Sequence, residues 1–166
     1  MQTFKVNARN FAYKVIIGEG AWGALRDFPR DAYTSAFILT ERGLWNRWSS
    51  LFLKESDLQR ARTLVVPSGE RSKSLLVLER LAGELLKQGA DRRSLLVLFG
   101  GGVIGDLGGF LASVYMRGID YVNIPTTVLA QVDSSIGGKT AVNLSEMKNL
   151  LGTFYPPRLV LSDPRV

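Results

Sequence analysis

The chain has 166 residues, of which 46% are hydrophobic and 22% are charged, and its formal net charge is +6. This length suits one α/β domain whose core needs no disulfide or metal to stabilise it. The sequence contains no cysteine and no histidine, which excludes disulfides, thiolate nucleophiles, zinc sites with Cys or His ligands and any Ser-His-Asp triad within the chain.

The positive charge does not favour a nucleic-acid partner. Between Leu95 and Val166 five basic residues balance five acidic ones, so the whole excess is scattered before Leu95. Nucleic-acid-binding proteins usually cluster their charge on one face. We interpret the excess as a solvated surface or as mild attraction for anionic small molecules. With no secretory signal at its start and no run of 18 apolar residues, the sequence predicts a cytoplasmic protein that binds neither nucleic acid nor membrane.

Strand patterns alternate with helical patterns along the chain. In chain order the sequence predicts a strand over 13–18, a short helix over 21–28, a strand over 36–40, a helix over 43–52, a strand over 61–69, a helix over 74–88, a strand over 94–99, a helix over 103–116, and strands over 121–126 and 158–163. This alternation is typical of βαβ units and predicts an α/β fold with a doubly wound, Rossmann-like, mainly parallel sheet. Because no helix follows the strand 158–163, we expect a truncated chain or an isolated domain.

Two predicted elements have clear signals. The strand 94–99 is an unbroken apolar run, as expected for a central parallel strand that is covered on both faces. The helix 74–88 has Ser72 or Ser74 as its cap and Gly89 at the position just past its end. Its predicted buried stripe consists of Leu75, Leu78, Leu81, Ala82 and Leu85.

Glycines concentrate in the second half of the chain. Gly100, Gly102 and Gly105 have the G-x-G-x-x-G spacing, after a strand and at the start of a helix, where backbone N–H groups can approach a pyrophosphate. The alternative is a tight turn with close helix packing, in which Gly108 and Gly109 let a neighbour approach. Asp120 lies near the position of the usual ribose-binding acid but precedes its strand. The spacing leaves both readings open.

Two polar segments are further candidates for a binding site. SIGGKT (135–140) is not a P-loop, because the first glycine of that motif would fall on Asp133. It belongs to a polar cluster that predicts either a lined site or an ordinary loop: Thr126, Thr127, Asp133, Ser134, Ser135, Lys139, Thr140, Asn143, Lys148 and Asn149. In PSGERSK (67–73), Glu70 and Lys73 either contact a nucleotide or decorate the first turn of a helix.

Three long segments closely resemble the 3-dehydroquinate synthase family: GGGVIGDLGGFLASVYMRG (100–118), IPTTVLAQVDSSIGGKTAVN (124–143) and MKNLLGTFYPPRLVLSD (147–163). Together with PSGERSK they extend the resemblance to most of the chain after Leu64, while the first 60 residues match more loosely. The resemblance implies that residues 1–166 are the N-terminal NAD-binding domain of a two-domain homodimeric enzyme.

The implied reaction is the second step of the shikimate pathway. Its substrate is a seven-carbon sugar-acid phosphate, 3-deoxy-D-arabino-heptulosonate 7-phosphate, and its products are 3-dehydroquinate and phosphate. The family uses NAD and a divalent metal, zinc or cobalt, which a glutamate and two histidines hold in a helical C-terminal domain. In register these ligands lie beyond Val166, so we expect no metal ligand in this chain and no activity from it alone.

The resemblance also implies roles for individual residues. The implied cofactor contacts are Glu41, Ser68, Gly69, Glu70, Lys73, Gly101, Gly102, Val103, Ile104, Gly105, Asp106, Thr126, Thr127, Lys139 and Lys148. The implied catalytic residues are Asp133, Lys139 and Asn149, with Arg117 offered to the substrate phosphate across the dimer. Glu41 stands where the family usually has aspartate, and its longer carboxylate can still reach a ribose.

Two alternatives share the same fold. One is the N-terminal domain of another NAD-dependent sugar-phosphate cyclase, and the other is a stand-alone nucleotide-binding module without catalysis.

Overall fold

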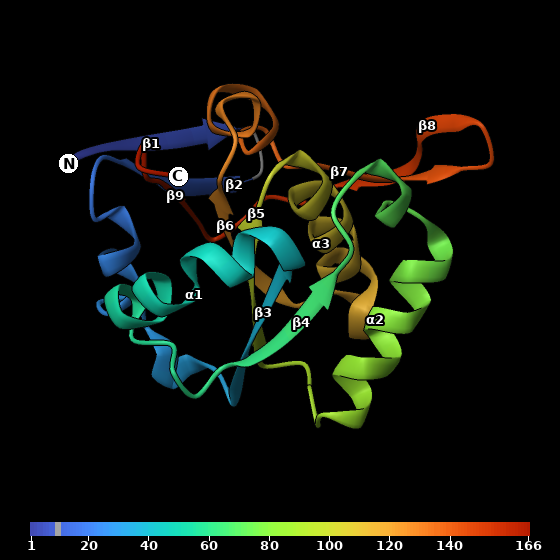
Figure 1. The fold of residues 1–166 in the computed structure, drawn as a ribbon, viewed down its shortest axis with the longest axis horizontal. Coiled ribbons are helices and arrows are strands. Elements are labelled where there is room, and N and C mark those ends of the chain that lie inside the picture. The colour runs from blue at the N-terminus through green and yellow to red at the C-terminus, as the bar shows by residue number, and fades with distance from the viewer. Residues whose placement is uncertain (9–10) are drawn as a thin grey trace.

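The computed structural model describes residues 1–8 and 11–166 (Figure 1). Its strands and longer helices are, in chain order, β1 (Gln2–Ala8), β2 (Phe11–Ile17), β3 (Ser35–Glu41), α1 (Arg42–Ser56), β4 (Arg62–Val66), α2 (Leu75–Lys87), β5 (Ser94–Gly100), α3 (Gly102–Val114), β6 (Asp120–Pro125), β7 (Lys139–Leu144), β8 (Met147–Phe154) and β9 (Leu159–Ser162).

Seven of these strands form one sheet in the order β1-β2-β9-β6-β5-β3-β4. All neighbouring pairs are parallel except β1 and β2, which form an antiparallel hairpin. β5 lies near the centre, and each of its seven residues is buried, as its apolar run predicts. The predicted fold class, a mainly parallel α/β sheet, is therefore confirmed.

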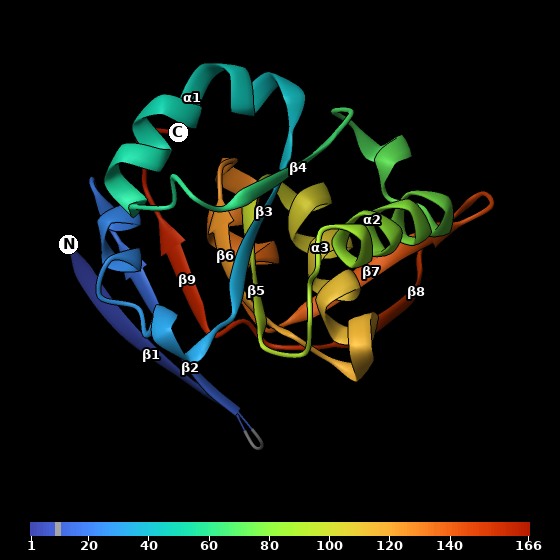
Figure 2. The same cartoon turned by 90° about the horizontal axis from the view of Figure 1, so that it is seen from below.

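Helices cover both faces of this sheet, so it is doubly wound, and Figure 2 shows α1 on one side with α2 and α3 on the other. On the α1 face Trp22 packs edge-on against Phe52 and Phe99 at 5.6 and 5.5 Å between ring centroids. On the opposite face Leu81 and Leu107, from α2 and α3, join the second cluster of buried side chains. Both faces of the sheet are thus buried, and the polar side chains that could bind ligands lie at its edges.

The caps predicted for α2 are confirmed, but one residue of its stripe is wrong. Ser74 Oγ accepts the N–H of Val77 at 3.4 Å, and Gly89 follows the helix with φ +77°. Leu75, however, is 39% exposed. At 3.6 residues per turn, Leu75 lies about 90° away from the centre of the buried face. Val77 packs against the core instead.

Other differences from the predicted elements are local. The short helix over 21–28 is a 3-10 helix of five residues, Ala21–Leu25. The strand predicted over 61–69 ends at Val66, and the helix predicted over 103–116 ends at Val114. The sequence did not predict β1, nor the antiparallel hairpin of β7 and β8 that packs beside α3 (Figure 1). A π-helical turn, Ala130–Ser134, joins β6 to this hairpin.

Candidate functional site

The carboxyl ends of β3, β5 and β6 meet at one edge of the sheet. The register pairs Thr40 with Phe99 and Gly100 with Pro125, so Glu41, Gly100 and Pro125 end neighbouring strands. The strand order reverses here, because β4 and β5 lie on opposite sides of β3. In open α/β sheets ligands bind outside the carboxyl ends at such a reversal. The edge formed by these three strand ends is therefore the first place to look for a site.

A glycine turn connects β5 to α3 at this edge. A Cβ atom on Gly100 would stand 2.4 Å from Ile104 Cγ1, and one on Gly101 would stand 3.0 Å from Thr127 Cγ2. α3 begins at Gly102 and has no side-chain cap, so its first N–H groups and its positive dipole end face the turn. The alternative of close helix packing is confirmed, since Cβ atoms on Gly108 and Gly109 would meet Leu98 and Thr140 at 2.3 and 2.5 Å. An uncapped helix start after a glycine turn is the usual geometry of an anion-binding site.

A pocket of about 490 Å³ lies on one side of the glycine turn, and we call it the β3 pocket. Four of the predicted cofactor contacts line it: Glu41, Ser68, Thr126 and Thr127. The remaining lining includes Leu44, Arg47 and Trp48 of α1, which sequence reasoning did not single out as site residues. An aromatic ring, an arginine and a carboxylate on one wall suit a ligand with a flat ring and hydroxyl groups.

A second pocket of about 450 Å³, the hairpin pocket, lies against β7, β8 and the π-helical turn. Asp106, Asp133, Lys139 and Asn149 all line it. Lys139 Nζ and Asp133 Oδ1 are 3.5 Å apart, and both side chains are more than half exposed. An ion pair this open exchanges with water readily and remains available to a charged ligand.

Lys73 is nearly completely buried, with 4% of its side chain exposed. Its ammonium donates hydrogen bonds to Asp106 of α3 and to the side-chain oxygen of Asn149 of β8. The chain of contacts continues through Asn143 Oδ1, which accepts the backbone N–H of Asn149 at 2.9 Å, and Asn143 Nδ2, which donates to Glu70 Oε1 at 2.8 Å. This network unites four predicted site residues from separate parts of the sequence.

The backbone at Asn149 helps to form this network. Its φ is +57°, in the left-handed region, although it lies inside a strand. Asparagine tolerates this region better than most residues. Such outliers cluster at functional sites, where surrounding contacts stabilise them.

Burial raises the pKa of the Asp106 carboxyl above its usual value, and the hydrogen bond and charge of Lys73 only partly offset this effect. A carboxyl group whose pKa is shifted in this way, beside a pocket, is typical of a functional site.

Two predicted residues lie apart from this cluster. Arg117 is exposed at the far end of α3 from the glycine turn, with φ +72°. Lys148 is exposed on β8, next to Asn149. The described residues of one chain therefore do not bring Arg117 to Asp133 and Lys139.

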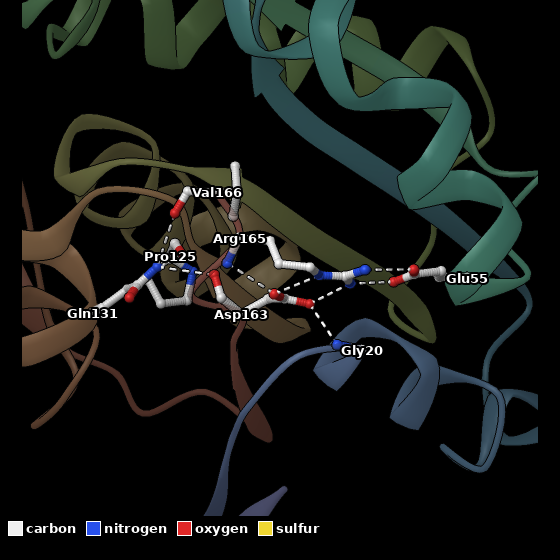
Figure 3. Close-up of polar contacts among 7 residues, drawn as sticks. All are labelled: Gly20, Glu55, Pro125, Gln131, Asp163, Arg165 and Val166. Atoms are coloured by element: carbon white, nitrogen blue, oxygen red, sulfur yellow. Dashed lines mark hydrogen bonds and ion pairs between the residues drawn. The ribbon is translucent and has the colours of Figure 1, made fainter.

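A second polar cluster, which the sequence did not predict, adjoins the β3 pocket, because Arg165 and Val166 belong to both. Figure 3 shows its polar contacts. The guanidinium of Arg165 lies between Asp163 and Glu55, with Nη2 2.7 Å from Glu55 Oε2. Asp163 is fully buried and also accepts the N–H of Gly20 at 2.8 Å. Gln131 of the π-helical turn donates to the backbone oxygens of Asp163 and Val166, both at 3.2 Å. The only sequence signal for it was an aspartate directly after the last strand.

Within residues 1–8 and 11–166 no three acidic side chains gather as metal ligands. These described residues therefore do not fit a divalent metal. None of the helices in the same residues is long and apolar enough to span a membrane.

The fold and the site define a class, that of Rossmann-like α/β domains with a glycine turn at the sheet reversal. The chain belongs to the 3-dehydroquinate synthase family, because the sequence model described as 3-dehydroquinate synthase N-terminal matches residues 63–166. This membership confirms the resemblance seen in the sequence.

Individual relatives agree. The 3-dehydroquinate synthase of Dictyoglomus thermophilum is 46% identical over 163 residues, which cover 98% of this chain and 45% of that protein. Among solved structures, a 2-deoxy-scyllo-inosose synthase with carbaglucose-6-phosphate, NAD+ and Co2+ superposes with a TM-score of 0.89 at 30% identity, over 99% of this chain and 46% of its own. The 2-epi-5-epi-valiolone synthase ValA of Streptomyces hygroscopicus, with NAD+ and Zn2+, gives 0.79 at 28%, over 98% and 46%. The chain spans about half the length of the curated relatives that it matches.

Proposed function

We propose that this chain is the NAD-binding half of a 3-dehydroquinate synthase and that it is catalytically incompetent alone. The whole protein would convert 3-deoxy-D-arabino-heptulosonate 7-phosphate into 3-dehydroquinate and phosphate in the shikimate pathway, as a cytoplasmic homodimer. The observation that carries the proposal is the network in which buried Lys73 holds Asp106 and Asn149, two residues that line the hairpin pocket beside the uncapped start of α3.

The residues present fit NAD. The N–H groups at the start of α3 face a turn in which Gly100 and Gly101 leave no room for a Cβ atom, and this suits a pyrophosphate. The β3 pocket suits the adenosine end, and Glu41, which lines it, would accept the ribose hydroxyls. Asp106 and Lys139, on the other side of the turn, line the pocket that suits the nicotinamide end. When bound, NAD would accept a hydride from the substrate carbon that bears a hydroxyl group and would later return it.

The chain's own residues would hold and orient the substrate. Lys139 is exposed, and among the residues that the structure describes its ammonium has one ion pair, the open one with Asp133, so it can bind an anionic group of the substrate. Asn149 points its side-chain oxygen at Lys73, which leaves its amide hydrogens for the ligand. Arg117 lies too far along α3 to join them within one chain, which supports the proposal that it reaches the substrate phosphate of a partner subunit.

The same observations support incompetence of the chain alone. The sequence has no histidine, and the described residues provide no set of metal ligands. In the π-helical turn beside the hairpin pocket and the two residues before it, three apolar side chains are exposed: Val128 at 78%, Leu129 at 70% and Val132 at 71%. Apolar side chains exposed next to a polar pocket mark a surface that another part of the protein covers. We propose that a helical, metal-binding C-terminal domain, carrying zinc or cobalt, fills this role.

Calorimetric titration of the 166-residue chain with NAD tests the proposal. We expect weak binding that Gly102→Val abolishes, because the new side chain fills the space at the start of α3. Its Cβ would stand 3.3 Å from Ser134 Oγ, so the fold should persist, as circular dichroism can check. Gly83→Val, on α2 where no atom lies within 4 Å of the added Cβ, is the matched control.

Two results would contradict the proposal. One is wild-type affinity for NAD in the Gly102→Val variant, which would mean that the glycine turn is not the pyrophosphate site. The other is measurable formation of 3-dehydroquinate by the purified 166-residue chain.

A different substrate is the second candidate, since two solved relatives that contain NAD+ are named 2-deoxy-scyllo-inosose synthase and 2-epi-5-epi-valiolone synthase. The curated relatives named 3-dehydroquinate synthase are more similar, at 39–48% identity. A substrate panel on the full-length enzyme separates these candidates. A stand-alone nucleotide-binding module would instead show a natural stop codon after Val166 in the coding sequence.

A further inference from the structure

A separate pocket lies at the amino ends of the parallel strands, one strand length from the glycine turn. We call it the amino-edge pocket, and its volume is about 680 Å³. Asp120 and Leu159, the first residues of β6 and β9, contribute to its wall, whereas the candidate site lies beyond the other ends of these strands. The amino-edge pocket shares no residue with the β3 pocket or the hairpin pocket.

Two lysines stand directly opposite each other on one wall of this pocket. Lys5 of β1 and Lys14 of β2 are register partners in the antiparallel hairpin, so their side chains point to the same face. Both are exposed, and neither makes an ion pair with any residue that the structure describes. Like charges directly opposite each other destabilise a strand pair. A bound anion between the two ammonium groups would relieve this repulsion.

A third cation reaches the pocket from the start of β9. Arg158 Nε donates to Asp120 Oδ1 at 2.8 Å, while the other oxygen of Asp120 accepts the hydroxyl of Tyr33 at 2.8 Å. Asp120 is therefore satisfied and holds the guanidinium in place. The terminal nitrogens of Arg158 bond to no group in residues 1–8 and 11–166, and they can donate to a carboxylate. Asp27 also lines the pocket, so three cations face two carboxylates, one of which is already paired.

Two stacked aromatic rings form part of the remaining wall. Phe28 and Tyr33 stack with ring centroids 5.9 Å apart and planes 10° from parallel. Stacked rings beside cationic side chains form a flat surface against which another ring can pack. The pocket volume falls in the range of small-molecule sites.

We propose that the amino-edge pocket binds a small aromatic carboxylate, with the ring against Phe28 and Tyr33 and the carboxylate between Lys5, Lys14 and Arg158. Lys5 and Lys14, two of the basic residues in the first half of the sequence, would thus bind the ligand at this pocket. The proposal does not depend on the proposed function, because no residue is shared.

Saturation-transfer NMR on the full 166-residue chain tests it, with benzoate, cyclohexanecarboxylate and inorganic phosphate as probes. We expect benzoate to bind more tightly than either of the other two. In Lys5→Gln/Lys14→Gln its dissociation constant should rise by about tenfold or more, because two charge-assisted contacts are lost. The control Lys54→Gln/Lys87→Gln removes two exposed charges from α1 and α2 and should leave the affinity unchanged.

Thermal unfolding provides a second readout. Without ligand, Lys5→Gln/Lys14→Gln should unfold at a slightly higher temperature than the wild type, because the opposed charges are gone. Benzoate should raise the midpoint of the wild type and not that of this variant. Absence of benzoate binding, equal binding of phosphate and benzoate, or unchanged affinity in Lys5→Gln/Lys14→Gln would each overturn the proposal.

Discussion

The ammonium of Lys73 donates a hydrogen bond to the carboxylate of Asp106, although 33 residues separate the two in the sequence. Lys73 directly precedes Ser74, the cap of α2, and Asp106 lies in the second turn of α3, so their contact joins the two helices on one face of the sheet. Lys73 is nearly inaccessible, with 4% of its side chain exposed, against 19% for Asp106. The pair therefore serves the site and the packing of the helices together.

Lys73→Met should destabilise the fold by about 2 kcal/mol, since a carboxylate that has lost most of its water also loses its charged partner. Urea denaturation at neutral pH measures the loss. Adding Asp106→Leu to Lys73→Met should recover part of it, because no unpaired charge then remains. Strictly additive effects of the two changes would contradict the coupling between them.

The pKa of Asp106 should lie above the usual value of an aspartate, because burial disfavours its charged form. Asp91 provides a contrast, since hydrogen bonds from Thr34 and from the backbone N–H of Arg93 lower its pKa. Carboxyl carbon NMR across the acidic range measures both groups. A raised pKa in the folded state means that this group's contribution to stability is complete below its unfolded pKa and is lost as the pH rises through the folded value. Asp106 titrating together with Asp91 would refute this prediction.

Gly108→Ala should destabilise the fold by about 2 kcal/mol, because the added methyl overpacks the core. Its Cβ would lie 2.3 Å from Leu98 Cδ2, inside the contact between α3 and β5. Gly83→Ala is the matched control on α2, with no atom within 4 Å of the new Cβ. There alanine should stabilise by about 0.5–1 kcal/mol through its higher helix propensity. Thermal unfolding of both variants checks the pair, and equal effects would be inconsistent with close packing at Gly108.

Arg165→Leu should cost about 3 kcal/mol, since it leaves the fully buried Asp163 without its guanidinium partner. Burial alone would raise the pKa of Asp163, but the hydrogen bonds from Arg165 and from the Gly20 N–H outweigh it and lower the pKa. A lowered pKa in the folded state means stability that is present above the unfolded pKa and is lost as the pH falls through the folded value. Urea unfolding between neutral pH and about pH 3 should show this loss in the wild type and less of it in Arg165→Leu. The same acid-induced loss in both proteins would rule out the role assigned to Arg165.

The elements that the sequence predicted well are those with strong local signals. The unbroken apolar run of β5 and the capped, periodic α2 are encoded within a few residues, so each can be predicted without knowledge of its contacts in the fold. The β7–β8 hairpin carries no such signal. Its strand β8 exposes Met147 at 60% and Phe154 at 80%, and a bulge between Val142 and Leu144 breaks the alternation. The hairpin therefore lacks the regular alternation of apolar and polar residues that predicts a half-buried strand.

The site shows the same division. The glycine turn follows from spacing, and the polar cluster around Lys139 stands out from its composition. The burial of Lys73 depends on α2, α3 and β8 meeting, and no spacing along one chain predicts such a meeting. The contacts among Glu55, Asp163 and Arg165 could not be predicted for the same reason, because Glu55 and Arg165 are 110 residues apart in the sequence.

The position of β9 in the sheet has a consequence for biosynthesis. β9 lies between β2 and β6, so the hairpin of β1 and β2 joins the sheet only through a strand near the other end of the sequence. The bond from the Gly20 N–H to Asp163 closes the same junction across 143 residues. During synthesis on the ribosome, the β1–β2 hairpin therefore cannot pair with the sheet before residues 159–162 emerge. Until then β6 also has one unpaired edge. An unpaired edge is a template for aggregation, so the nascent chain is most vulnerable, and most in need of a chaperone, just before β9 is completed.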